Sequence, residues 1–132
     1  MHASTNNMLH IENSEIAFQI LKKHFNPFAE EFWGIFLDSQ LNLIKTEMIH
    51  KGTANHCMIH PRDLFRSAIY NNSTKIIIAH NHTSISILPS NSDLIVTKRF
   101  LKISKIMEIP IVDHIIFNST CFYSFKSNNL IK

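Results

Sequence analysis

The sequence predicts one α/β domain, in which helices flank a single mixed β-sheet. Three observations predict this fold class. The chain has 132 residues, a length that suits one domain. Residues 75–80 form a short, continuous apolar stretch, which is typical of a strand buried on both faces. Helical and strand patterns alternate along the chain, and this order favours helices layered on a central sheet.

The first half of the chain predicts a helix followed by a β-hairpin. The helical pattern begins at Ser14 and is expected to end at Asn26–Pro27. Residues 30–38 are rich in aromatic side chains and predict a buried strand. Residues 42–51 alternate between apolar and polar positions and predict a second strand, so the short gap at 39–41 is expected to form the hairpin turn.

The second half predicts two helices and three strands. Pro61 suits the first position of a helix over 61–71, and Ser90 suits the N-cap of a helix over 91–107. Strands are predicted at 75–80, 111–118 and 121–125. The stretch from the buried strand through the second of these helices lies where α/β sheets usually carry their chemistry, at the carboxyl end of a strand.

Composition excludes several classes of protein. Two cysteines, Cys57 and Cys121, are too few for a disulfide scaffold or a four-cysteine zinc site, and we expect reduced thiols. No apolar run approaches the ~20 residues that span a membrane, and the N-terminus does not resemble a signal peptide. We therefore expect a cytoplasmic protein without membrane association. We also expect the chain to consist of an N-terminal tail with a short helix (1–26) and a main domain (27–132).

Two histidines and an aspartate predict a metal site. His80 and His82 are two residues apart after a buried strand, so both side chains project to the same side of extended backbone. Asp93 lies in the first turn of the next helix, within reach of the same point. Two imidazoles and one carboxylate suit zinc and leave the fourth tetrahedral position for water. Hydrolysis would then need a carboxylate from elsewhere as general base.

The same residues also have ordinary structural roles. Ser90 and Asp93 have the spacing of a helix capping box, and nine histidines will form close pairs by chance. The combined spacing is more specific than either part, because it directly follows a buried strand. Capping and metal binding do not exclude each other, since one serine and one aspartate can do both.

The spacing His80-x-His82-x7-Ser90-x-x-Asp93 matches the JAMM signature of JAB/MPN-type zinc metalloproteases. From about residue 28 to 125 the chain resembles the RadC family, whose members carry a DNA-repair label. The resemblance implies the deaminase-like α/β fold of JAB domains, zinc bound by the two histidines and the aspartate, and hydrolysis of an amide or isopeptide bond in a peptide substrate. It also implies that Ser90 donates a hydrogen bond to the developing oxyanion. The flanking matches are Gly52–Thr53, His60–Pro61–Arg62–Asp63, Ala79–His80–Asn81–His82, Pro89–Ser90, Thr97, Asp113–His114 and Tyr123–Ser124–Phe125.

The resemblance also implies a catalytic base. The Glu-x-Phe lead-in of the family aligns with Glu30 and Phe32, so Glu30 is expected to activate water and then protonate the leaving amine. Only one of Glu30 and Glu31 can face the site, because strand residues alternate between faces. Glu31 stays open as the alternative, since a register error of one residue exchanges the two.

The metal loop departs from the family, which typically has His-Asn-His-Pro-Ser-Gly. Thr83 replaces the proline and Ile85 the glycine, and an isoleucine would be strained at positive φ. These changes keep open a second function, a non-catalytic accessory module that associates weakly with DNA. A nucleobase deaminase is set aside, because it needs a Pro-Cys-x-x-Cys motif that is absent from this sequence.

Three further features have open interpretations. Asp113–His114 is expected either to orient a ligand histidine or to form a buried pair that links strands. Arg62 is expected to be exposed, with the substrate cleft as the alternative. A basic face on the helix over 91–107 is expected to be solvated, with phosphate contact as the alternative; its residues are Lys98, Arg99, Lys102 and Lys105.

Overall fold

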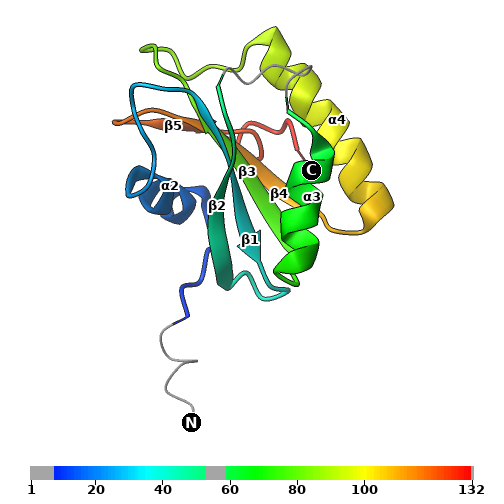
Figure 1. Cartoon of the computed structure of the whole chain (residues 1–132). Helices are drawn as coiled ribbons and strands as arrows, with labels where there is room; N and C mark the ends of the chain where they lie inside the picture. Colours follow the sequence, from blue (N-terminus) through cyan, green and yellow to red (C-terminus); the bar gives the residue numbers. More distant parts are fainter. Residues whose placement is uncertain (1–7, 53–58, 132) are drawn as a thin grey trace.

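The computed structural model describes residues 8–52 and 59–131 and shows one mixed sheet between two layers of helices (Figure 1). In these residues the sheet has five strands in the order β2-β1-β3-β4-β5. β3 and β4 are parallel, and the other neighbours are antiparallel. The elements are α2 (Ser14–Lys22), β1 (Glu31–Leu37), β2 (Leu43–Lys51), α3 (Pro61–Tyr70), β3 (Lys75–Asn81), α4 (Asn91–Met107), β4 (Ile111–Phe117) and β5 (Phe122–Ser124). The predicted fold class is confirmed.

Each face of the sheet has its own hydrophobic core, because side chains of a strand alternate between faces. On β1, Trp33 and Ile35 pack in the core that contains α2. Phe32 and Phe36 pack on the opposite face, with α3 and α4. Figure 1 shows this layering, with α2 on one side of the sheet and the other two helices on the other. Burial of both faces explains why β1 and β3 read as nearly continuous apolar runs.

The predicted elements within the described residues are confirmed, with small differences at their ends. The first helix begins at Ser14 as expected, but its N-cap is Asn13, whose side chain accepts a hydrogen bond from the amide of Ile16 at 3.0 Å. The helix ends at Lys22, earlier than the predicted stop at Asn26–Pro27. Cys57 lies outside the described residues, and Cys121 is exposed with a free thiol. None of the described helices is long and apolar enough to cross a membrane.

The connection from β3 to β4 positions the candidate site. The chain leaves the carboxyl end of β3, runs through a loop over 82–90, follows α4 and returns in β4 parallel to β3. The amide of His82 donates to the carbonyl of Phe117 at 2.9 Å, which fixes the start of the loop to the end of β4. The carboxyl end of β3 and the N-terminus of α4 therefore lie together, at the end of the sheet where the parallel strands β3 and β4 finish.

Replacing Gly34 by alanine should destabilise the fold. A Cβ at this position in β1 would lie 2.9 Å from Cζ of Phe36 and 3.1 Å from Cδ1 of Leu64 on α3. Overfilling a packed core costs about 1–3 kcal/mol. Chemical denaturation should show a fall of this size in the free energy of unfolding, and an unchanged midpoint would contradict the close packing of β1 against α3.

Candidate metal centre

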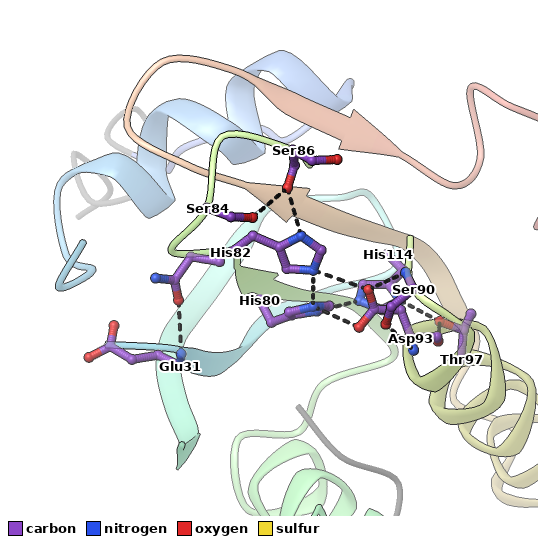
Figure 2. Close-up of polar contacts among 10 residues, drawn as sticks. Glu31, His80, His82, Ser84, Ser86, Ser90, Asp93, Thr97 and His114 are labelled. Atoms are coloured by element: carbon purple, nitrogen blue, oxygen red, sulfur yellow. Dashed lines mark hydrogen bonds and ion pairs between the residues drawn. The ribbon is translucent and has the colours of Figure 1, made fainter. Parts of the chain in front are cut away.

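His80, His82 and Asp93 meet at the edge of the sheet (Figure 2). Nε2 of His80 lies 2.9 Å from Oδ1 of Asp93, and Nε2 of His82 lies 3.1 Å from Oδ2. The two Nε2 atoms are 3.1 Å apart. His80 is the last but one residue of β3, His82 follows the strand, and Asp93 is in the first turn of α4. The three residues predicted as ligands are thus brought together by the β3–α4 connection.

The spacing of these atoms fits a zinc ion. Zinc bonds of about 2.0–2.1 Å at tetrahedral angles separate neighbouring ligand atoms by about 3.3 Å. The three donor groups lie close to that separation, and their ligand atoms are all within 4.8 Å of one another. Two nitrogens and one oxygen are also a donor set that zinc accepts. The residues present therefore fit the metal that the resemblance implies.

The loop holds His82 with one nitrogen directed at the cluster. Its Nδ1 lies 2.9 Å from the carbonyl oxygen of Ser86. A carbonyl can only accept, so Nδ1 carries the proton and donates, and in the neutral ring Nε2 keeps its lone pair. In the charged ring Nε2–H can donate to Asp93, and this hydrogen bond raises the pKa of His82 despite partial burial; the charge of Glu30 acts in the same direction.

Asp93 caps its helix and also lies in the predicted site, as its spacing predicts. Its amide donates to Oγ of Ser90 at 3.1 Å, and the amide of Ser90 donates to Oδ2 of Asp93 at 2.8 Å, which completes a capping box. Burial raises the pKa of the Asp93 carboxyl, but the neighbouring rings of His80 and His82, together with the amide of Ser90, outweigh burial and hold this pKa well below its usual range. Asp93 is therefore a carboxylate, the form that binds metal.

Replacing Ser90 by alanine should destabilise α4 without unfolding the protein. The hydroxyl accepts the Asp93 amide, and losing such an N-cap costs about 0.5–2 kcal/mol. Thermal unfolding should show a lower midpoint for Ser90→Ala, while Ser90→Thr, which keeps a capping hydroxyl, should recover most of the loss. Equal midpoints for the alanine and threonine variants would contradict the capping role.

The open question about Asp113–His114 is resolved by strand alternation, which sends the two side chains to opposite faces of β4. The carboxylate of Asp113 accepts from the hydroxyl of Ser124 at 2.6 Å and from the amide of Lys126 at 3.0 Å, so it ties β4 to the C-terminal segment. His114 instead reaches the site, where its Nε2 lies 3.1 Å from Nδ1 of His80. Only His114 contacts a predicted ligand, and the two side chains do not pair.

His114 is wholly buried and contacts the cluster of His80, His82 and Asp93 through His80. Burial lowers its pKa well below the ordinary value, and the neighbouring His80 acts in the same direction. Its Nδ1 makes a short hydrogen bond with Oγ1 of Thr97 on α4. Thr97 was noted in the sequence only as a family match, and its link to the site depends on how α4 packs over β4.

Of the two candidate bases, Glu31 is the first residue of β1 and Glu30 directly precedes this strand. Glu31 is only 6% exposed, and its Oε1 accepts from Nε1 of Trp33 at 3.2 Å and from the amide of Asn26 at 3.0 Å. Figure 2 shows its side chain directed away from the histidines. Glu30 precedes the strand, and alternation gives it the face of Phe32, whose ring stacks on His80 with centroids 6.5 Å apart. The arrangement therefore favours Glu30 over Glu31.

Asn81 was noted in the sequence only within a family match, and its role comes from the structure. It lies between the two histidines but points to the opposite face, where it is completely buried. Its Oδ1 accepts from the amide of Glu31 at 2.8 Å, and its Nδ2 donates to the carbonyl of Ala29 at 2.8 Å. These bonds hold the backbone on both sides of Glu30. An asparagine at the end of a buried strand, where its amide needs hydrogen-bond partners, was the signal that could have pointed to it.

The altered metal loop is not strained at Ile85. Among the described residues other than glycine, positive φ occurs at Leu41, Asn72, Glu108 and Asn129. The isoleucine that replaces the family glycine therefore has an ordinary backbone, and its side chain is 95% exposed. Strain from this replacement, which the sequence raised as a concern, is absent.

Of the remaining candidates, Arg62 is an exposed residue at the start of α3, where it forms an ion pair with Asp63 at 3.5 Å. The basic side chains predicted along α4 are exposed; they are Lys98, Arg99, Lys102 and Lys105. Both stay at the surface, as expected.

Comparison with known proteins identifies the family. A family model described as "RadC-like JAB domain" matches residues 11–130. A UPF0758 protein of Finegoldia magna is 44% identical over 98 residues, which cover 74% of this chain and 44% of that protein. A UPF0758 protein of Pasteurella multocida is 40% identical over 121 residues, covering 91% and 54%. The chain thus spans about half the length of these relatives. The chain belongs to the family of RadC-like JAB domains, as its motifs predicted.

Proposed function

We propose that this domain is a zinc-dependent hydrolase of the JAMM type, which cleaves an amide or isopeptide bond in a peptide substrate. The observation that supports it most is the convergence of His80, His82 and Asp93, with contacts of 2.9–3.1 Å at the end of β3. Three ligands leave one tetrahedral position open, which is typical of a catalytic zinc site and not of a structural one.

Each side chain around the cluster has a part in the proposed reaction. Zinc, when bound, supplies Lewis acidity that polarises a carbonyl oxygen and acidifies water. The carboxylate of Glu30 takes a proton from the attacking water and later delivers it to the leaving amine nitrogen. The hydroxyl of Ser90 accepts the Asp93 amide, so its own proton stays free to donate to the oxyanion.

The support for Glu30 is positional. It directly precedes β1, where alternation gives it the face of Phe32. Its charge acts to raise the pKa of His82, and Asn81 holds the backbone on both sides of it. Its side chain is only partly buried, which leaves the carboxylate in contact with water, its reactant. Glu31 is occupied by Trp33 and Asn26 on the opposite face.

Metal analysis together with a cleavage assay tests the proposal. Protein stripped with a chelator and reloaded with zinc should bind one equivalent. It should then cleave members of a quenched-fluorescence library that contains both peptide bonds and amides of the lysine side chain. Cleavage should disappear on chelation and return with zinc. Protein that binds no zinc, or that binds zinc and cleaves nothing in either format, would contradict the proposal.

The basic face of α4 favours a second function, a non-catalytic module that associates with DNA. Lys98, Lys102 and Lys105 are exposed and spaced for one side of the helix. Fluorescence anisotropy with duplex DNA tests it. Binding that weakens with salt, persists in Glu30→Gln and fails when the three lysines become glutamine would support this function. Binding that is undetectable at low salt would exclude it.

A further inference from the structure

The buried His114 joins two of the three predicted ligands through a continuous chain of hydrogen bonds. Its ring is 0% exposed and stacks on Phe125 with centroids 4.4 Å apart. Among the described residues its Nε2 contacts Nδ1 of His80 and its Nδ1 contacts Oγ1 of Thr97. The chain continues from Thr97, whose hydroxyl lies 2.7 Å from the carbonyl oxygen of Asp93 (Figure 2).

In this series of hydrogen bonds, the donor and acceptor of each bond follow from the last acceptor, the carbonyl oxygen of Asp93. A backbone carbonyl can only accept, so the single hydroxyl proton of Thr97 points at Asp93. Oγ1 of Thr97 must then accept from His114, which places the ring proton on Nδ1. Nε2 of the neutral His114 consequently carries a lone pair and accepts from Nδ1–H of His80.

The result at His80 is the tautomer that a metal requires. With its proton on Nδ1, the ring directs the lone pair of Nε2 at the cluster. His82 has the same tautomer for a separate reason, since its Nδ1 donates to the carbonyl of Ser86. Two imidazole lone pairs and the Asp93 carboxylate then face one another at 2.9–3.1 Å, an arrangement that is favourable around a cation.

We propose that Thr97, acting through His114, is a positioning residue that holds His80 in its metal-binding tautomer and thereby sets the zinc affinity of the site. The inference rests on the proposed function, because it assumes that the cluster binds zinc. It explains why a fully buried position against Phe125, which phenylalanine would fill without a polar cost, holds a histidine.

The pair Thr97→Val and Thr97→Ser provides the decisive comparison. Valine keeps the shape of threonine but removes the hydroxyl, so Nδ1–H of His114 loses its acceptor and the ring is free to donate to His80 from Nε2. Serine keeps the hydroxyl and serves as the matched control. Competition with a chromogenic chelator should show zinc affinity that falls about 10–100-fold in the valine variant, the usual effect of losing an outer partner of a ligand. The serine variant should stay near wild type.

A second measurement on the wild-type protein needs no variant. Long-range ¹H–¹⁵N NMR of the zinc-loaded protein should show the ring protons of both His80 and His114 on Nδ1. A proton on Nε2 of His114, or equal zinc affinity in the two Thr97 variants, would overturn the inference and leave the proposed function intact. Wild-type protein that binds no zinc would overturn both. If the valine variant does not fold, the ring tautomer decides.

Discussion

Replacing His82 by alanine should abolish tight zinc binding and leave the fold in place. Nε2 of His82 is one of only three predicted ligand atoms, and its other polar contact is to the loop carbonyl of Ser86. Outer partners of a ligand are worth about 10–100-fold in metal affinity, so loss of the ligand itself should cost more than about 100-fold. Chelator competition measures this loss, and circular dichroism reports the fold.

His60 offers a matched control for this variant. It is an exposed histidine at the start of α3, and its side chain makes no capping hydrogen bond. His60→Ala should bind zinc as the wild type does, which separates loss of the site from the general effect of removing an imidazole. Zinc affinity that is equal in His82→Ala and His60→Ala would show that the cluster at the end of β3 is not the metal site.

The fold was largely predictable because its signals are local. Burial of both faces makes β1 and β3 read as apolar runs, and Ser90 and Pro61 mark the starts of the helices that cover one face. The three predicted ligands were also local, since they lie on one connection between β3 and α4. Spacing along the sequence was therefore enough to predict that these three side chains meet.

The surroundings of the ligands were not predictable in the same way. The contact of His114 with His80 depends on the register of β3 against β4, and its contact with Thr97 depends on how α4 packs. Neither contact is indicated by residues at a short, fixed spacing in the sequence. The choice between Glu30 and Glu31 likewise depends on one residue of register, and the hydrogen bonds of Asn81 and Trp33 favour Glu30 only once the strands are paired.

Replacing Glu30 by glutamine should remove catalysis while zinc binding is retained. The amide keeps the size of the side chain but cannot take a proton from water, and general acid–base catalysis is worth about 10²–10⁴-fold in rate. We expect a loss of that size in kcat/KM on a library peptide that the wild type cleaves. Zinc affinity should change little, because Glu30 is not one of the three ligand residues.

Glu31→Gln is the matched control for this loss, one residue along the chain and on the other face of the sheet. Its Oε1 can still accept from Trp33 and Asn26, so the variant should fold and cleave like the wild type. Both variants remove one charge near the start of β1 and keep the size of the side chain. Full activity in Glu30→Gln would rule out the assigned base, and a loss confined to Glu31→Gln would show that the catalytic carboxylate comes from the face that this structure turns away from the histidines.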